Sequence, residues 1–438
     1  MSTVVSRTQD TEVRSFRHRP RPASVISEVP GAHANLAHMF ASSACRVGTI
    51  AVVGILALAG CSQETPRAVA VLDTPLPDIA PSVLDQRGTI VQSTPVEGLD
   101  PALADKLGEA RTVVYRSVSA YDGQTSEVAS TVYRPRGDAP AGGWPVISYG
   151  HPTTGLGQDC GPSLSPDLRG YAPTLAAIAE AGFVVTMTDF QGLGWPGEHP
   201  YLEPRTAGFN MIDAVRAVRN QYPDTSDRWM AVGGSQGGQA SWAANEYSAD
   251  YGSGLNLVGS VSTSPAVDIT GFAEAARNES LTGAQTAFMP LIIDGLSVVH
   301  PDLDQSEYLR GAAAGELAGL TSCALPDTEK AALSTQLDAP QVRPASDEAT
   351  DRLTEWLTEA SLPQRRAPAP MLVINGSDDE LILPAWVSKA VDAGCRIGER
   401  IVHREMAGQG HADADAGDEM YQWMLERFSG KDAPNECP

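Results

Sequence analysis

Short apolar stretches alternate with amphipathic stretches along most of the chain after residue 100. Many of the apolar stretches are rich in β-branched residues and apolar at nearly every position, which predicts buried strands. Apolar residues between several of them recur at helical spacing, which predicts helices at Tyr171–Ala181, Gly208–Asn220 and Gln236–Ala249. The alternation indicates an α/β fold with a mostly parallel sheet covered by helices on both faces. The expected strands are Thr112–Ser117, Glu127–Tyr133, Trp144–Tyr149, Phe183–Thr188, Trp229–Val232, Leu257–Ser262, Met371–Asn375 and Arg400–His403.

The pattern changes between about residues 266 and 367. This stretch is rich in Ala, Leu and Glu, has helical spacing at Gly311–Leu320 and Asp347–Ala360, and ends in a Pro-rich segment. We therefore expect an α/β core made of residues 101–265 and 368–438, with a helical cap insert at residues 266–367.

The N-terminal segment is typical of an export signal and is not expected to be part of the folded domain. An apolar stretch, Val47–Gly60, follows Arg46 and is shorter than the roughly 20 residues that span a bilayer. The string Leu58–Cys61 resembles a bacterial lipobox, which implies lipidation of the Cys61 thiol; a plain secretory signal or a short anchor helix is the alternative. Residues 1–60 are thus a leader, with translation starting at Met1 or at Met39, and residues 61–100 a tether and N-terminal arm. The expected location is outside the cytoplasm, as a cell-envelope lipoprotein or a secreted protein.

Charge excludes two classes of partner. The chain has 438 residues, 42% of them hydrophobic, and a formal charge of −23. Residues 62–438 hold 25 Lys and Arg against 51 Asp and Glu, so this part alone carries −26. Such a surface repels nucleic acids and anionic lipids, so membrane attachment is expected only through the lipid on Cys61.

The most informative motif lies in residues 229–238. A short apolar strand runs into the Gly-x-Ser-x-Gly turn Gly233–Gly237, which opens a predicted helix. Such a strand–turn–helix exposes the serine hydroxyl, and the first helical amides point toward the attacked carbonyl. Ser235 is therefore the candidate nucleophile, and the amide of Gln236 a candidate oxyanion donor. A glycine-flanked loop after the strand Trp144–Tyr149 is expected to supply the second donor, Thr153, because Pro152 has no N–H.

The acid and base are expected downstream of Ser235, because the order Ser, acid, His is typical of α/β-hydrolases. His411 lies in a loop after the last strand and is the candidate base, whereas His403 lies within that strand and is expected to be structural. Asp379 follows Gly376 by three residues and is the candidate acid, with Asp378 as the alternative.

Two polar residues upstream of the nucleophile are expected to play supporting parts. His151 lies in the oxyanion loop and is expected to position it. Asp189 follows a strand and is expected to hold loop amides as a structural carboxylate.

Five motifs occur together in this chain: Gly150–Gly155, Cys160–Ser163, Asp189–Gly194, His199–Leu202 and the turn around Ser235. Taken together, these motifs resemble the secretory lipases of the Candida lipase A type and their actinobacterial relatives. The resemblance runs from about Asp100 to the C-terminus. It implies an α/β-hydrolase core, a helical cap over the site, and hydrolysis of acylglycerols or similar esters.

Six cysteines occur, of which Cys45 leaves with the leader and Cys61 would carry lipid. The remaining four allow three pairings in an oxidising compartment. The family resemblance implies the pairs Cys160–Cys323 and Cys395–Cys437.

The sequence thus predicts a serine carboxylic-ester hydrolase, a triacylglycerol lipase or esterase of lipid catabolism acting on a small-molecule or lipid ester. Acyl transfer or peptide hydrolysis by the same triad, and a non-catalytic lipid-binding lipoprotein, are the alternatives. No His, Cys or carboxylate set has metal-ligand spacing, so we expect neither metal nor other cofactor. The insert is expected to enclose the ester in an apolar pocket. Its apolar residues, most of which are expected to form its own core, include Phe272, Phe288, Met289, Leu291, Ile292 and Ile293.

Overall fold

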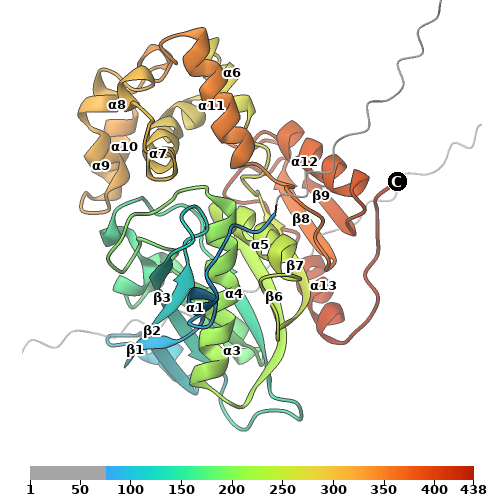
Figure 1. Ribbon diagram of the computed structural model, residues 1–438. Coiled ribbons are helices and arrows are strands. Elements are labelled where there is room, and N and C mark those ends of the chain that lie inside the picture. The colour runs from blue at the N-terminus through green and yellow to red at the C-terminus, as the bar shows by residue number, and fades with distance from the viewer. Residues whose placement is uncertain (1–74) are drawn as a thin grey trace, which may run out of the picture. The chain divides into compact units, whose positions relative to one another are not determined.

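The computed structural model describes residues 75–438 (Figure 1). The leader, Met39 and the candidate lipidation residue Cys61 lie outside the described residues.

Among residues 75–438, nine strands form a single sheet in the order β1-β2-β3-β5-β4-β6-β7-β8-β9. Antiparallel pairing joins β1, β2, β3 and β5, and parallel pairing joins β5, β4, β6, β7, β8 and β9. The predicted mostly parallel α/β sheet is therefore confirmed. The strands are β1 (Ile90–Pro95), β2 (Glu109–Val118), β3 (Thr125–Arg134), β4 (Trp144–Gly150), β5 (Val184–Thr188), β6 (Thr225–Gly234), β7 (Asn256–Thr263), β8 (Met371–Gly376) and β9 (Ile401–Met406).

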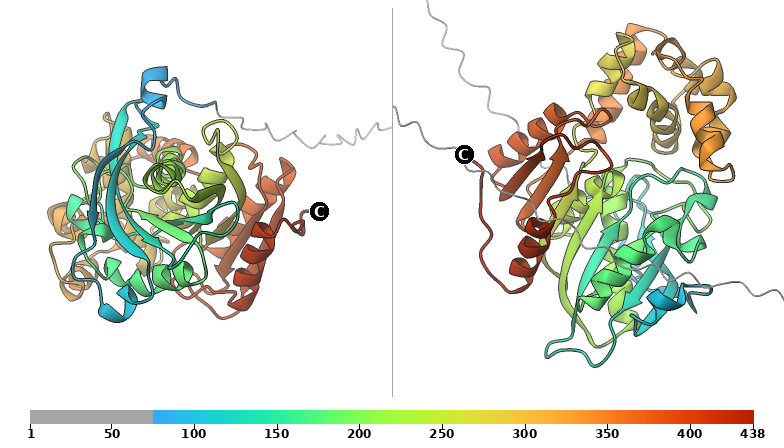
Figure 2. Two further views of the ribbon diagram at one scale, coloured as in Figure 1. Left: turned by 90° about the horizontal axis from the view of Figure 1, so that it is seen from below. Right: turned by 180° about the vertical axis from the view of Figure 1, so that it is seen from behind.

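Helices cover both faces of the sheet, as two views of the ribbon show (Figure 2). Successive residues of a strand point to opposite faces, so in β6 Trp229 and Ala231 pack toward α4 and α5 while Met230 and Val232 pack toward α3 and α13. The helices of the core are α3 (Ala172–Glu180), α4 (Pro204–Gln221), α5 (Gln236–Tyr247), α12 (Pro384–Arg396) and α13 (Asp418–Phe428), with short helices α1 (Pro81–Leu84) and α2 (Pro101–Ala104) near the start.

One strand lies in the stretch expected to be a tether and arm. Residues 90–95 form β1, which pairs antiparallel with β2 at the edge of the sheet. This part of the expected arm therefore belongs to the sheet.

The chain between β7 and β8 holds helices and no strand (Figure 1). The stretch expected as one helix, Gly311–Leu320, forms two short helices separated at Glu316. The helices are α6 (Gly271–Arg277), α7 (Gly283–Val299), α8 (Ala312–Gly315), α9 (Leu317–Thr321), α10 (Asp327–Ser334) and α11 (Asp347–Glu359).

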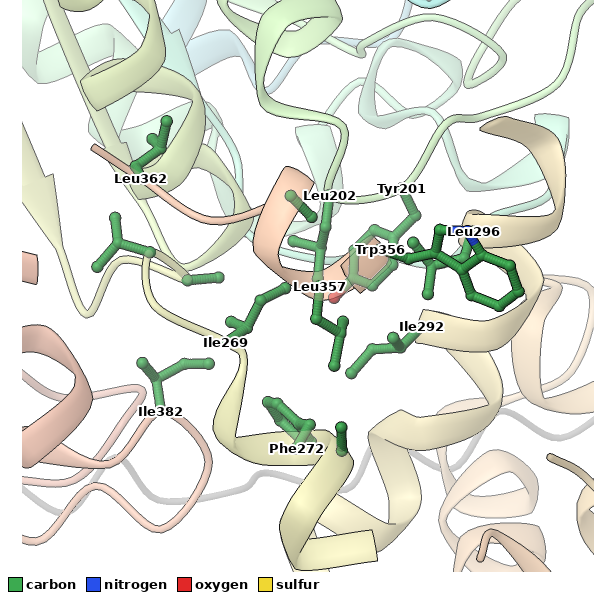
Figure 3. Packing of buried hydrophobic residues seen from close by; sticks show 14 of the residues in the cluster. Tyr201, Leu202, Ile269, Phe272, Ile292, Leu296, Trp356, Leu357, Leu362 and Ile382 are labelled. Carbon is green, nitrogen blue, oxygen red and sulfur yellow. The ribbon is translucent and has the colours of Figure 1, made fainter. Parts of the chain in front are cut away.

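Apolar side chains of these helices form a core that continues onto α12 and β8 (Figure 3). Phe272, Ile292, Leu296 and Trp356 are buried in it together with Leu202 of the core. The insert is thereby packed against α12 and the segment that contains Leu202.

Candidate active site

Ser235 lies in a tight turn between β6 and α5. Its backbone has a positive φ of 55°, a conformation that costs a non-glycine residue about 1–3 kcal/mol and is maintained by its surroundings. The Ser235 amide donates to the carbonyl oxygen of Thr263 at 2.8 Å, which ties the turn to the end of β7. A methyl group on Gly233 or Gly237 would overlap neighbouring backbone, so only glycine fits at these two positions. The main chain thus holds the Ser235 side chain at the carboxyl edge of the sheet.

His411 joins Ser235 to Asp379. Its Nδ1 lies 2.7 Å from Asp379 Oδ2, and its Nε2 lies 2.9 Å from Ser235 Oγ. A carboxylate only accepts hydrogen bonds, so Nδ1 carries the proton and Nε2 is free to accept one from the Ser235 hydroxyl. The structure therefore brings the three residues predicted from the sequence into one hydrogen-bonded chain.

Asp379 is fixed by its own loop. Its side chain is fully buried, and Oδ1 accepts from the amides of Leu381 and Ile382 at 2.9 Å each. Asp378 is exposed and accepts from the hydroxyl of Ser377, so its carboxylate does not contact His411. A methyl group at Gly376 would overlap the carbonyl of Gln409, so close backbone packing brings the acid loop and the base loop together. The geometry favours Asp379 over Asp378.

The two expected oxyanion donors lie on either side of the turn. Gln236 is the first residue of α5, where backbone amides have no partner inside the helix. Thr153 lines the same cavity as Ser235 and His411, in the loop after β4. Its hydroxyl lies 2.8 Å from the hydroxyl of Tyr201.

A second layer holds the side chain of Gln236. Gln236 Nε2 lies 2.7 Å from His199 Nε2, and His199 Nδ1 lies 2.8 Å from the carbonyl oxygen of Gln191. The carbonyl accepts only, so Nδ1 is protonated and Nε2 accepts from the amide of Gln236. Burial lowers the pKa of His199 to about 4, so this ring stays neutral. Neither His199 nor Tyr201 was predicted from the sequence to have a role in the site. Both lie in the motif His199–Leu202, which could have indicated one.

The remaining candidates take structural positions. Both ring nitrogens of His151 face backbone carbonyls, those of Pro152 at 2.7 Å and Asp189 at 3.2 Å, so it braces the oxyanion loop. Asp189 accepts from the amide and the hydroxyl of Ser163, as expected of a structural carboxylate, and burial raises its pKa to about 7. His403 Nε2 lies 2.6 Å from Asn375 Oδ1 and does not contact Ser235.

A cavity of about 700 Å³ contains Ser235 and His411 in its wall. Of the lining residues in the described part of the chain, the insert contributes Phe288 of α7 and the core contributes the others. The other apolar candidates of the insert pack in the insert's own core, as expected for most of them. Figure 3 shows Phe272 and Ile292 among the buried residues of this core. The insert therefore contributes little to this cavity, whose space opens between core helices, and the expected enclosure of the ester by the insert stays a prediction.

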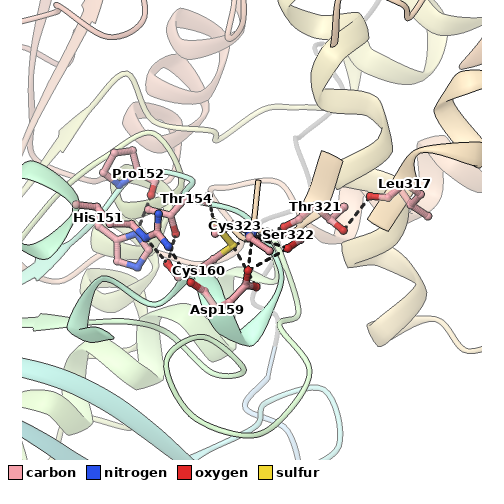
Figure 4. The surroundings of a disulfide bond; sticks show 11 residues. His151, Pro152, Thr154, Asp159, Cys160, Leu317, Thr321, Ser322 and Cys323 are labelled. Carbon is pink, nitrogen blue, oxygen red and sulfur yellow. Dashed lines mark hydrogen bonds between the residues drawn. A yellow bond between two sulfur atoms is a disulfide. The ribbon is translucent and has the colours of Figure 1, made fainter. Parts of the chain in front are cut away.

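Both disulfide bonds that the resemblance implied are present. Cys160–Cys323 links the loop after β4 to the end of α9 (Figure 4), and Cys395–Cys437 links α12 to the C-terminal tail. Asp159 Oδ2 also accepts from the amide of Cys323 at 2.9 Å. The oxyanion-side loop is thus bonded to the insert.

Within residues 75–438, no group of three or more His, Cys, Asp or Glu side chains could hold a metal ion. No helix in the same range is long and apolar enough to cross a membrane.

Solved structures show the same fold. The rice cell wall degrading esterase LipA from Xanthomonas oryzae aligns with a TM-score of 0.62 and 19% identity, covering 78% of this chain and 97% of the esterase. Candida antarctica lipase A in its closed state aligns with a TM-score of 0.63 and 17% identity, covering 84% of this chain and 89% of the lipase. Both comparisons support the α/β-hydrolase assignment of the sheet and its helices.

Sequence relatives extend over most of the chain. A protein named as a probable inactive lipase of Mycobacterium tuberculosis is 26% identical over 369 residues, 78% of this chain and 79% of that protein. A secreted triacylglycerol lipase of Malassezia globosa is 23% identical over 380 residues, 80% of this chain and 79% of the lipase. Residues 172–436, which include Ser235, Asp379 and His411, match the secretory lipase family. On this match the chain belongs to the secretory lipase family.

Proposed function

We propose that this protein is a serine carboxylic-ester hydrolase, a triacylglycerol lipase or esterase that serves lipid catabolism. One observation carries the proposal: Asp379, His411 and Ser235 form a continuous hydrogen-bonded chain that ends in the wall of a mostly apolar cavity. This is the constellation that activates a serine hydroxyl.

The reaction follows from the positions of these groups. Ser235 Oγ attacks the ester carbonyl carbon while His411 Nε2 takes the hydroxyl proton, and Asp379 stabilises the imidazolium without taking a proton itself. The tetrahedral oxyanion accepts hydrogen bonds from the amides of Gln236 and Thr153, each worth about 3 kcal/mol of transition-state stabilisation. The intermediate then releases the alcohol, which leaves with the proton from His411. In the second half, His411 takes a proton from water, hydroxide attacks the acyl-enzyme, and the acid leaves as Ser235 regains its proton.

The name of the Mycobacterium tuberculosis relative raises the opposite possibility, a family member without activity. In this chain the three groups are all present and mutually hydrogen bonded, which supports turnover. A non-catalytic lipid-binding lipoprotein would not require a fully buried Asp379 aligned with His411. Acyl transfer and peptide hydrolysis use the same triad and are separated from ester hydrolysis by assay.

We also propose that the protein is exported, with lipid on Cys61. The secretory family, the secreted relative of Malassezia globosa and the two disulfides support export. Metabolic labelling with an alkyne fatty acid tests the anchor: label that persists in a Cys61→Ser variant would contradict lipidation at this residue.

The activity is tested with a fluorophosphonate probe and p-nitrophenyl butyrate. We expect labelling and hydrolysis in the unmodified protein, and loss of both in Ser235→Ala. Ser280→Ala, a serine on the insert outside the cavity, serves as the matched control and retains both.

Absence of labelling in the folded, unmodified protein would instead support the binding protein. Faster cleavage of a p-nitroanilide peptide than of the butyrate ester would make the protein a peptidase. Ester formation with an added alcohol that outpaces hydrolysis would make it an acyltransferase.

A further inference from the structure

The cavity that begins at Ser235 continues as a groove between two core helices. Its floor is formed by Ile147 of β4 and Val232 of β6, on the face of the sheet opposite α4 and α5. One wall comes from α3 and the other from α13. We call this space the α3/α13 groove and define it by Ile147, Val232, Thr174, Ala177, Ile178, Ala181, Met420, Tyr421, Met424 and Leu425.

The α3 wall is a second apolar stripe on one helix. Leu175, Ala176 and Ala179 pack on the sheet and are fully buried. Thr174, Ala177, Ile178 and Ala181 are spaced i, i+3, i+4 and i+7, so they share the neighbouring side of the helix. Ala177 and Ala181 are nevertheless exposed. An apolar stripe left open beside an active site is typical of a binding surface.

The α13 wall repeats the arrangement. Trp423 is buried against the sheet, while Met420, Tyr421 and Leu425 stay partly or fully accessible along the groove. Tyr421 is one of the few large apolar side chains exposed among the described residues, at 44%. Two flexible methionines, Met420 and Met424, can adapt to a chain of variable shape.

The lining carries little charge. Among the described residues of the lining, Asp415 is the one carboxylate and there is no Lys or Arg. Burial raises the pKa of Tyr149 to about 12, so the phenol at the groove entrance is neutral at physiological pH. A groove of this composition favours a neutral hydrocarbon over a sugar or a charged group.

The direction of the groove follows from the topology. Strand β4 runs up to the catalytic edge and β5 runs parallel to it, so α3 between them runs back down the sheet. Thr174 therefore lies near Ser235 and Ala181 at the far end. There Phe183 packs on Phe428 with ring centroids 4.9 Å apart and closes the floor.

The length of the groove limits its occupant. Seven residues separate Thr174 from Ala181, about 10 Å of helix at 1.5 Å per residue. An extended polypeptide advances about 3.5 Å over three bonds, hence a hydrocarbon chain about 1.2 Å per bond. The groove thus accommodates about eight to ten carbons.

We propose that the α3/α13 groove binds the unbranched acyl chain of the ester, and that α3 and α13 rather than the insert set the preferred chain length. The inference rests on the proposed hydrolase function. The acyl half stays bonded to Ser235 Oγ through both chemical steps, so it occupies the cavity whose wall contains that oxygen.

The test places a bulky side chain at two depths. Ala177→Phe fills the groove about one turn from its entrance and Ala181→Phe fills its far end. Ala332→Phe, an exposed alanine of α10 outside the cavity, is the matched control. The readout is kcat/KM for p-nitrophenyl esters from acetate to hexadecanoate, expressed relative to acetate for each variant.

We expect the unmodified protein to gain up to about fourfold per added CH₂, the equivalent of 0.8 kcal/mol, until the groove is full at eight to ten carbons. Ala177→Phe should lower the decanoate-to-acetate ratio by more than about tenfold and move the optimum to four carbons or fewer. Ala181→Phe should spare butyrate and lose only the longer chains. A general loss of stability would lower kcat/KM for esters of every chain length and would not depend on the depth of the substituted residue in the groove.

Three results would overturn the proposal. One is a chain-length profile that is the same in Ala177→Phe, Ala181→Phe and Ala332→Phe, as expected if another segment of the chain fills the groove. The second is a profile that shifts only when the alcohol of an alkyl butyrate is lengthened. The third is a preference for acetate that falls steadily with length.

Binding separates this inference from the proposed function. Decanoic acid should bind Ser235→Ala in isothermal titration calorimetry, and Ala177→Phe in that background should weaken the binding by at least about tenfold. Equal binding in the two proteins would refute the groove even if hydrolysis proceeds. If Ala177→Phe weakens binding but the unmodified protein hydrolyses no ester, the proposed hydrolase function would be refuted. The proposal that the groove binds an acyl chain would stand.

Discussion

At the scale of single residues, Asp379 and His411 each use one side-chain atom for a hydrogen bond that holds them in place. Each uses its other polar atom to contact the next residue of the triad. Asp379 uses Oδ1 for two loop amides and Oδ2 for His411. His411 uses Nδ1 for Asp379 and turns Nε2 to Ser235. Each contact fixes the next, so the consequences of a substitution depend on its place in this chain.

Replacing Asp379 with asparagine should lower kcat by about 10⁴, because an amide can donate to Nδ1 and stabilise the wrong imidazole tautomer. Asp378→Asn is the matched control, since that carboxylate is exposed and does not reach His411. Steady-state kinetics with p-nitrophenyl butyrate measures both. Equal losses in the two variants would show that the loop, rather than the Asp379 carboxylate, matters.

The hydroxyl of Tyr201 should position the oxyanion loop through Thr153, 2.8 Å away. Tyr201→Phe removes one neutral hydrogen bond of about 1 kcal/mol, so kcat should fall about fivefold with KM unchanged. Tyr133→Phe is the control, because the Tyr133 hydroxyl is buried and without a hydrogen-bond partner among the described residues. A rise in KM with constant kcat in Tyr201→Phe would mean that this hydroxyl binds the ground state instead.

At the scale of elements, the sequence predicted the parts whose pattern is local. The eight expected strands and the three core helices formed because most of these strands are short apolar runs and the helices carry apolar residues at helical spacing. Strand β1 was not predicted, because it lies at the edge of the sheet and none of its residues is buried. The expected helix at Gly311–Leu320 divided because Gly311 and Gly315 lower helix propensity at both ends of its first turn.

Site residues, too, could be predicted only from a local motif or from the order of elements along the chain. Ser235 and Gln236 belong to a local motif, and the order of elements was enough to place His411 after the last strand. The groove could not be predicted, since its walls are α3 and α13, which lie at opposite ends of the core sequence. Whether two such helices touch or leave space depends on tertiary packing, which no local pattern encodes.

The two disulfides should differ in their contribution to stability. Cys160 and Cys323 are 163 residues apart and Cys395 and Cys437 are 42 apart. Loop-closure entropy gives about 5 and about 4 kcal/mol respectively, so the double Cys→Ser variant of the first pair should unfold at lower denaturant. Urea unfolding followed by fluorescence measures both.

Measuring kcat/KM provides a second test on the same Cys→Ser variants. Of the two disulfides, Cys160–Cys323 is the one that joins the loop near Thr153 to the insert, so its loss alone should also lower kcat/KM at temperatures where the protein is folded. A larger kinetic effect from the Cys395–Cys437 variant would contradict this assignment.

At the scale of the whole molecule, several carboxyl groups are buried in a chain that is already acidic. Burial raises the pKa of Asp189 and of Glu399 to about 7 and of Asp213 to about 6. The pKa of Glu246 is raised by burial and by the charge of Glu399. These groups hold protons in the folded protein at pH values where the unfolded chain has lost them.

The sign of the resulting pH dependence is fixed. Between pH 6.5 and 8 the folded state binds more protons than the unfolded state, so the free energy of unfolding falls as pH rises, by roughly 1 kcal/mol for each carboxyl near pKa 7. Burial lowers the pKa of His151 and His199, which costs stability only below about pH 6.5, where the unfolded imidazoles protonate. The melting temperature should therefore be higher at pH 6.5 than at pH 8.

The difference should persist in 0.5 M NaCl, because salt screens surface repulsion but hardly reaches buried groups. Asp189→Asn should flatten the dependence, while Asp378→Asn, on the surface, should leave it unchanged. A melting temperature that rises from pH 6.5 to pH 8 would show that these carboxyls are ionised in the folded protein.

Gly150, Gly233 and Gly237 determine how the active site responds to warming. Gly150 and Gly233 are paired between β4 and β6, and a methyl on Gly237 would overlap the carbonyl of Gly150. Main-chain atoms alone therefore set the spacing between the nucleophile and the loop that carries Thr153, with no rotatable side-chain bond in between. Rotamer exchange on warming cannot widen this spacing, and the entropy of arranging it is lost once, during folding, rather than at every turnover. Catalytic competence should accordingly vanish in the same cooperative step as the sheet itself, without an earlier loosening of the active site.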